Sequence, residues 1–203
     1  MTAIRWIMAL VAIGGIGAAL AISRQATPAT IDAAVSADRG VVAEPPILDA
    51  GPAPSVGEAA AWLNTAGLDD GDLAGRVVLY DFWTFGCVNC RNTLPHVKAW
   101  QERYAGDGLI ILSIHTPEFD YEADPGNVAE FVEANGITYP VALDPERAIW
   151  RTWDNHYWPA FYLHDGQGRL RLRHIGEGGY EGTEDAIRSL LGVDPDSPRA
   201  AVG

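Results

Sequence analysis

Two apolar segments of strand length, separated by one helical segment, constrain the fold of this chain more than any other feature. Residues 76–83 (RVVLYDFW) and 109–116 (LIILSIHT) are rich in β-branched and aromatic residues and have the length of buried strands. Residues 88–105 carry apolar side chains at helical spacing, at Leu94, Val97, Trp100 and Tyr104. Two buried strands joined through a helix indicate an α/β layered domain.

The remaining segments continue this alternation as far as residue 193. We expect a short first element at 59–65, a helix at 125–136, a strand at 137–143 and a helix at 145–154. Residues 160–165 and 170–176 flank the turn Gly166-Gln167-Gly168 as a hairpin. Thr183 is the expected N-cap of a last helix that ends at Gly192. We therefore predict a domain over residues 57–193 and a disordered tail at 194–203.

The first 24 residues contain an uncharged run, from Trp6 to Ser23, preceded by Arg5. As a helix this run would cover about 27 Å, close to the thickness of a bilayer's hydrocarbon core. It is either a signal peptide cleaved near Ala19-Leu20-Ala21 or a signal anchor that is retained. Its length favours the anchor. Both alternatives place the domain on the periplasmic side, anchored to the inner membrane or secreted after cleavage.

Composition changes after the apolar run. Residues 25–56 are dominated by Ala, Pro, Gly and Asp without a persistent period, which predicts a flexible tether spanning about 30 Å. Within it, residues 41–48 are a candidate edge segment that packs on the domain. The whole chain has 27 acidic against 14 basic residues and a net charge of −13, which argues against nucleic acid as a partner.

The two cysteines of the chain, Cys87 and Cys90, lie at the predicted strand-to-helix junction. A helix N-terminus offers free amides and a positive dipole end, both of which favour a thiolate. Cys90 lies one helical turn on, so the pair can form a disulfide and exchange two electrons. A purely structural staple is disfavoured because so short a loop constrains the unfolded chain little. Zinc is disfavoured because there is no second cysteine pair, so we expect neither metal nor cofactor.

Two further residues belong to this candidate site. Asp81 interrupts the apolar run six residues before Cys87, which predicts a buried carboxyl with a raised pKa that exchanges a proton with Cys90. The alternative is an Asp at a strand end in water. Pro159, in HYWPAFYL, precedes a predicted strand, where either a cis or an ordinary trans peptide bond fits. If the bond is cis, Trp158 presents its backbone to a bound peptide.

The segment YDFWTFGCVNC, with Pro95 after it and WPA before a terminal hairpin and helix, resembles the active-site region of the thioredoxin superfamily. The resemblance covers about residues 57–193. An extra segment at 117–136 resembles the exported branch that includes TlpA and ResA. The motifs FWTFGCVNC, HTPEF, PGNV, YPVALD, YWPA and GEGGY are most similar to the thioredoxin-like domain of DipZ proteins.

This resemblance implies a thioredoxin fold, a central mixed sheet flanked by helices, with an insertion after a central strand. It implies that Cys87 attacks, Cys90 resolves and Asp81 relays protons. It also assigns substrate-binding positions near the cysteines: Trp83, Val88, Asn89, Glu118, Trp158 and Pro159. Glu118, in HTPEF, is the residue expected to tune the disulfide. The dipeptide Val88-Asn89 departs from the Gly-Pro of cytoplasmic thioredoxins, which leaves the redox potential open.

The expected function is that of a membrane-tethered thiol–disulfide oxidoreductase acting on disulfides of exported proteins. The neutral dipeptide favours a reductase, because no His stabilises the thiolate strongly. The chain has one apolar segment, so electrons are expected from a separate membrane partner similar to CcdA or DsbD. Two alternatives are a thiol peroxidase on the same fold and a protein that assembles copper or other metal sites.

Overall fold

The computed structural model describes Leu48 and residues 51–203. The predicted membrane segment (1–24), residues 25–47 of the predicted tether, and thus most of the candidate edge segment, lie outside the described residues. Among the described residues, no helix combines the length and the apolar character that crossing a membrane requires.

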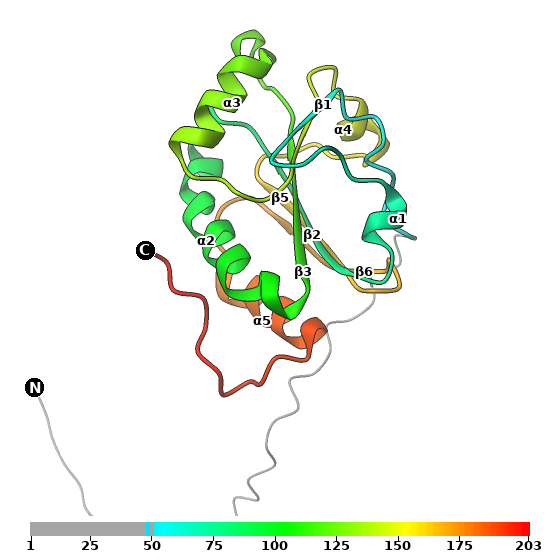
Figure 1. The fold of residues 1–203 in the computed structure, drawn as a ribbon, viewed down its shortest axis with the longest axis vertical. Helices are drawn as coiled ribbons and strands as arrows, with labels where there is room; N and C mark the ends of the chain where they lie inside the picture. Colours follow the sequence, from blue (N-terminus) through cyan, green and yellow to red (C-terminus); the bar gives the residue numbers. More distant parts are fainter. Residues whose placement is uncertain (1–47, 49–50) are drawn as a thin grey trace, which may run out of the picture. The chain divides into compact units, whose positions relative to one another are not determined.

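Six strands form one mixed sheet in the order β1-β4-β3-β2-β5-β6 (Figure 1). Their bounds are β1 Ala61–Leu63, β2 Val77–Trp83, β3 Leu109–His115, β4 Val141–Leu143, β5 Ala160–His164 and β6 Leu170–Ile175. β2, β3 and β4 are parallel to one another, while β5 is antiparallel to β2 and β6, and β1 is antiparallel to β4. All seven residues of β2 are buried. This explains why the strand reads as an almost unbroken apolar run.

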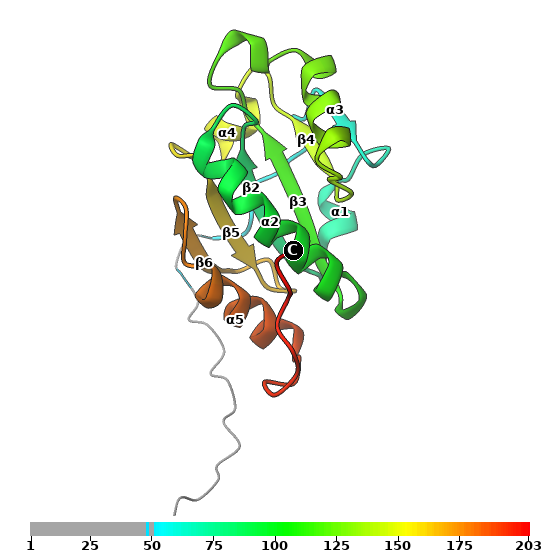
Figure 2. The ribbon, with the colours of Figure 1, turned by 90° about the vertical axis from the view of Figure 1, so that its left-hand side faces the viewer.

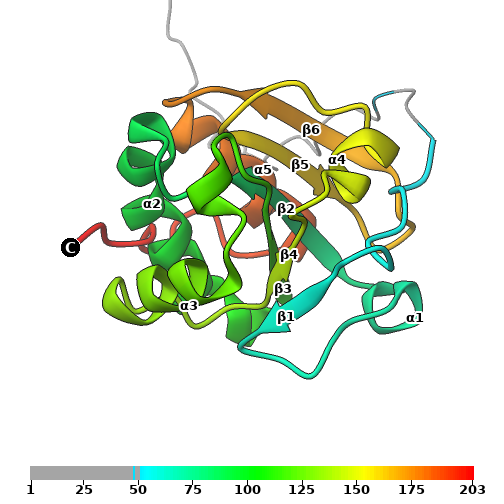
Figure 3. The ribbon, with the colours of Figure 1, turned by 90° about the horizontal axis from the view of Figure 1, so that it is seen from above.

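Helices cover both faces of the sheet (Figure 3). They are α1 Asp70–Leu73, α2 Val88–Tyr104, α3 Pro125–Ala134, α4 Ala148–Thr152 and α5 Tyr180–Leu191, with short 3₁₀ turns η1 Ala105–Asp107 and η2 Asp120–Glu122. Leu79 and Trp83 of β2 pack in the core under α2, α3 and α5, the helices in front of the sheet in Figure 2. Tyr80 and Phe82 pack on the other side, with α4. The two-residue period of a strand thus divides β2 between two cores.

The predicted insertion at 117–136 contains η2 and α3, between β3 and β4. α3 begins as predicted at Pro125, and the Asp124 side chain caps it by accepting from the Gly126 amide at 2.7 Å. Val128 and Val132 bury one face of the helix in the core. η2 lies between the end of β3 and this anchored helix.

The folded unit begins earlier than the predicted boundary at residue 57. Pro52 bridges to Arg169 of the hairpin turn, and the Leu48 amide donates to the Leu170 carbonyl at 2.8 Å. Val56 is fully buried. Residues 51–56 therefore belong to the domain, because their backbone continues along the exposed edge that β6 would otherwise present.

The last helix also begins earlier than predicted. α5 starts at Tyr180 with Gly179 as its N-cap, in the left-handed region at φ 62°. Thr183, the predicted cap, lies inside the first turn and its hydroxyl donates to the Gly179 carbonyl at 3.1 Å. The sequence favoured Thr183 because Gly179 has no side chain to cap a helix, yet only a residue that tolerates a positive φ fits this tight entry.

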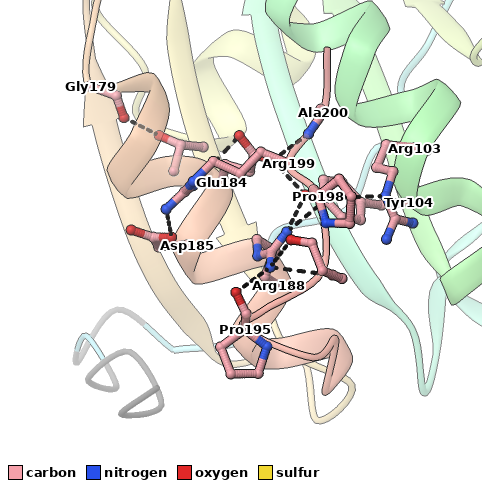
Figure 4. Close-up of polar contacts among 12 residues, drawn as sticks. Arg103, Tyr104, Gly179, Glu184, Asp185, Arg188, Pro195, Pro198, Arg199 and Ala200 are labelled. Carbon is pink, nitrogen blue, oxygen red and sulfur yellow. Dashed lines mark hydrogen bonds and ion pairs between the residues drawn. The ribbon is translucent and has the colours of Figure 1, made fainter. Parts of the chain in front are cut away.

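Within the tail at 194–203 that was predicted to be disordered, residues 194–200 make hydrogen bonds to α5 (Figure 4). The buried Arg188 guanidinium donates to four carbonyl oxygens of this segment, those of Asp194, Pro195, Ser197 and Pro198. One turn earlier, the Glu184 carboxylate accepts from the Ala200 amide at 2.7 Å and from the Tyr104 hydroxyl. Two buried charges on one face of α5 thus satisfy the polar backbone of a segment whose composition is typical of a disordered tail.

Arg188→Met should lower the free energy of unfolding by about 2–4 kcal/mol, because it removes a buried guanidinium that donates to four carbonyl groups of this segment and to the Tyr104 hydroxyl. Arg199→Met is the matched control: its guanidinium pairs with Asp185 but is 46% exposed, so the loss should stay below about 1 kcal/mol. Urea unfolding followed by circular dichroism measures both. Equal losses for the two variants would contradict the role assigned to Arg188.

Candidate active site

Cys87 is the N-cap residue of α2, and its sulfur accepts a hydrogen bond from the Cys90 amide at 3.2 Å. Both thiols are free. Cys87 is half-buried and is followed by the exposed Val88 (62%) and Asn89, whereas Cys90 is buried, at 3% exposure. A large substrate can therefore reach only the Cys87 sulfur, at the end of the helix where amides and dipole favour a negative charge.

Cys90 is held in its protonated form. Burial raises the pKa of its thiol well above the ordinary value, and the adjacent Cys87 sulfur raises it further. The negative charge of Asp81 adds a smaller effect in the same direction. A thiol in this position attacks a disulfide only when a base removes its proton.

Asp81 is buried, as the sequence predicted. It lies on the same face of β2 as Leu79 and Trp83, toward α2, and is 5% exposed. Burial raises the pKa of its carboxyl to about 7. The Ser113 hydroxyl on β3 opposes this shift without reaching hydrogen-bond geometry, and Oδ1 of Asp81 has no partner. A buried carboxyl that titrates near neutral pH can both take and return a proton.

The Trp83 side chain is buried beneath the site and is not exposed at its surface. It is buried in the same core as Cys90, edge-on to His115 with ring centroids 5.0 Å apart. Its indole N–H has no hydrogen-bond partner. Trp83 therefore positions the site through packing, and the direct substrate contact expected from the resemblance stays a prediction.

Trp158 and Pro159 lie at the end of the sheet from which Cys87 follows, because Ala160 is opposite Phe82 in the β2–β5 register. The Trp158-Pro159 peptide bond is cis. The Pro159 carbonyl accepts from the Gly176 amide at 2.8 Å. The Trp158 ring lies 4.2 Å from that of Trp150, and its indole N–H donates to the Thr116 carbonyl at 3.0 Å. The loop before β5 is thereby fixed beside the end of β3.

Exposed apolar side chains gather in the segments around this end of the sheet. Five of the large hydrophobic residues that are exposed in the described chain belong to this apolar rim: Val88, Phe119, Tyr121, Tyr157 and Ile175. Val88 follows Cys87, Tyr157 precedes Trp158, and Ile175 pairs with Ala160. Exposed apolar side chains clustered beside a reactive group indicate a surface that binds another chain.

A second carboxylate, which the sequence analysis did not single out, lies against the turn before Cys87, while the tuning role expected of Glu118 stays a prediction. The Glu118 side chain is exposed, whereas Glu122 is fully buried, at 0% exposure. One Glu122 oxygen accepts from the Gly86 amide at 2.7 Å, directly before Cys87. The other accepts from the amides of Glu118 and Phe119 at 2.7 and 2.9 Å. Burial acts to raise the pKa of Glu122, but these hydrogen bonds outweigh it and lower the pKa below the ordinary value.

His115 contacts the same turn before Cys87. Burial lowers the pKa of its imidazole to about 4, so the ring is neutral at physiological pH. Its Nε2 lies 3.4 Å from the Phe85 amide and 3.3 Å from the Thr84 hydroxyl. The sequence interpretation stopped at the motif HTPEF, but the signal for both residues was present. His115 is the first residue of this motif, at the end of a buried strand, and Glu122 lies three residues after its end.

The described residues contain no group of three or more His, Cys, Asp or Glu side chains placed to hold a metal ion. The hypothesis of a metal-assembly protein therefore gains no support from residues 51–203, and it stays a prediction to be tested in solution.

Comparison with known proteins decides the family. A family model described as the AhpC/TSA family matches residues 53–173, more than half of the chain. The chain belongs to this family. The solution structure of a thioredoxin-like protein in its oxidised form is 30% identical, with a TM-score of 0.63, and covers 70% of this chain and 95% of that one. The predicted thioredoxin fold, a mixed sheet flanked by helices, is confirmed.

Two relatives confirm the resemblance seen in the motifs. Protein DipZ of Mycobacterium tuberculosis (strain CDC 1551 / Oshkosh) is 45% identical over 144 residues, 70% of this chain. The thiol-disulfide oxidoreductase ResA of Bacillus thuringiensis (strain Al Hakam) is 28% identical over 119 residues, 59% of this chain. The chain spans 21% of DipZ and 66% of ResA. Among its relatives are thus proteins named as thiol–disulfide oxidoreductases.

Asp81→Asn should stabilise the dithiol form in a pH-dependent manner. The raised pKa means that native Asp81 binds more protons than unfolded Asp81 between about pH 4 and pH 7, so its contribution to stability falls as pH rises. The increase in the free energy of unfolding caused by Asp81→Asn should be near zero at pH 4 and on the order of 4 kcal/mol at pH 8. Urea unfolding in reductant at both pH values measures it. A gain that is the same at both would contradict the raised pKa.

Proposed function

We propose that this protein reduces disulfides in exported proteins on the periplasmic side of the inner membrane, to which its N-terminal segment tethers it. One observation carries the chemistry: the accessible Cys87 sulfur lies at a helix N-terminus, while Cys90 is buried beside a carboxyl that titrates near neutral pH. This arrangement separates an attacking thiol from a resolving thiol and supplies a base for the second.

The reaction proceeds in two exchanges. The Cys87 thiolate attacks one sulfur of a substrate disulfide, forms a mixed disulfide, and the other substrate sulfur leaves as a thiolate that takes a proton. Asp81 then accepts the Cys90 proton, and the Cys90 thiolate attacks the Cys87 sulfur. The second substrate thiolate leaves and is protonated, and a disulfide joins Cys87 and Cys90. Two electrons have passed from the protein to the substrate.

The surface around Cys87 supports a polypeptide substrate. The apolar rim exposes side chains in the segments at the end of the sheet that carries Cys87, and a small disulfide would leave them uncovered. The cis Trp158-Pro159 segment lies at the same end of the sheet, and Val88 and Asn89, directly after Cys87, are exposed. We propose that the backbone of the cis-proline segment binds an extended client segment while its disulfide is exchanged.

The place of action and the electron donor follow from the N-terminal sequence and from redox balance. The uncharged run at residues 6–23 supports a signal anchor or a cleaved signal peptide. Each turnover leaves the cysteine pair oxidised, so a donor must return two electrons on the same side of the membrane. A separate membrane protein similar to CcdA or DsbD supplies them in this proposal.

Reduction of insulin disulfides tests the proposed roles of the cysteines. Cys87→Ser should remove measurable activity, because no accessible thiol remains. Cys90→Ser should still attack and should accumulate a mixed disulfide with the substrate, visible as a band on a non-reducing gel that dithiothreitol abolishes. Wild-type activity in Cys87→Ser would overturn the proposal. Faster Cys87-dependent consumption of peroxide would favour the thiol peroxidase, and copper retained by the reduced protein on dialysis would favour metal-site assembly.

The reduction potential of the cysteine pair tests the direction of electron flow. Equilibration of the wild-type protein with glutathione or dithiothreitol should give a value near that of thioredoxin, about −270 mV. A value near about −120 mV, that of a strong oxidant, would reverse the proposed direction while leaving the exchange chemistry intact.

A further inference from the structure

Residues 84–87 form a turn between β2 and α2 in which each amide after Thr84 has an acceptor. The Cys87 amide donates to the Thr84 carbonyl at 3.3 Å, within the turn. The other two acceptors come from outside it: the Phe85 amide faces the His115 ring, and the Gly86 amide donates to Glu122. The geometry of the turn that carries the attacking cysteine is therefore set by β3 and the segment after it.

Among the acceptors of these turn amides, Glu122 is the one that carries a charge. Its carboxylate is ionised, fully buried, and shared between the turn before Cys87 and the amides of its own loop. Three backbone donors replace the water that a buried charge loses. The charge cannot move away from the turn without leaving these donors unsatisfied.

Gly86 makes the approach of this carboxylate possible. A Cβ atom at position 86 would lie within 3.0 Å of the Glu122 Oε1 and Tyr121 Oη atoms, closer than real Cβ atoms come to other atoms. The backbone of Gly86 has no positive φ, so the close approach is the feature that demands glycine here. The position of the Glu122 carboxylate therefore depends on glycine at position 86.

We infer that Glu122 is a positioning residue that fixes the turn before Cys87 and, through its buried negative charge, lowers the reduction potential of the cysteine pair. The reduced pair reacts through a Cys87 thiolate, which a negative charge fixed one residue away destabilises. The disulfide carries no charge and is not affected in this way. Destabilising the reduced form makes the pair a stronger reductant, so this inference rests on the proposed redox function and deepens it.

Glu122→Gln and Glu118→Gln form a matched pair for the test. Each removes one carboxylate charge from the same loop, but only the first carboxylate is buried against the turn. The fraction of dithiol is measured at fixed ratios of reduced to oxidised glutathione. Glu122→Gln should shift the equilibrium toward the dithiol by about tenfold, which is about 30 mV for a two-electron couple. Glu118→Gln should change it by less than about twofold, because an exposed charge is screened.

An unchanged or lower potential in Glu122→Gln would overturn the inference, as would a larger shift in Glu118→Gln. If Glu122→Gln does not fold, Gly86→Ala tests the same inference. Its methyl group displaces the Glu122 carboxylate from the turn, and the carboxylate itself is retained. This variant should shift the equilibrium in the same direction, and no shift would overturn the inference. The glutathione equilibrium needs no turnover, so it is measurable even if the wild-type protein fails to reduce insulin and the proposed function falls.

Discussion

Complete burial of β2 is the constraint on which the rest of the structure depends. The strand lies between β3 and β5, with a core on each face. Its position places three groups at once: Asp81 beneath the first turn of α2, Trp83 in the core below the site, and Cys87 at the helix start. Because β2 is held from every side, the turn that leaves it has little freedom except in the choice of its hydrogen-bond acceptors.

The pKa values of two buried carboxyl groups near the cysteines are shifted in opposite directions. Asp81 has an oxygen without a partner, so burial dominates and it holds a proton near neutral pH. Glu122 accepts from three backbone amides, so the hydrogen bonds dominate and it stays charged. The same type of side chain thus titrates near neutral pH at Asp81 and stays ionised at Glu122. Both follow from how many donors the fold supplies at each place.

The cis-proline loop lies at the same end of the sheet as Cys87 and is held in place by several contacts. The loop is held by Trp158, which packs on Trp150 and donates to the end of β3. The Arg147 guanidinium lies over the Trp158 ring and donates to the Pro117 carbonyl, so the insertion and the loop are tied together. Contacts between residues far apart in the chain therefore join the insertion, the cis-proline loop and the end of β3.

The sequence by itself determined the alternation of strands and helices, the strand-to-helix position of the cysteines and the burial of Asp81, because each depends on local pattern and spacing. The tertiary structure alone decided that the Glu122 carboxylate binds the Gly86 amide, that α5 begins at Tyr180, and that hydrogen bonds hold residues 194–200. The Glu122 contact joins residues 36 positions apart, and the Glu184 carboxylate that accepts from Ala200 also accepts from Tyr104, 80 positions away. A hydrogen bond between distant segments leaves no period in the sequence, so only the folded chain reveals it.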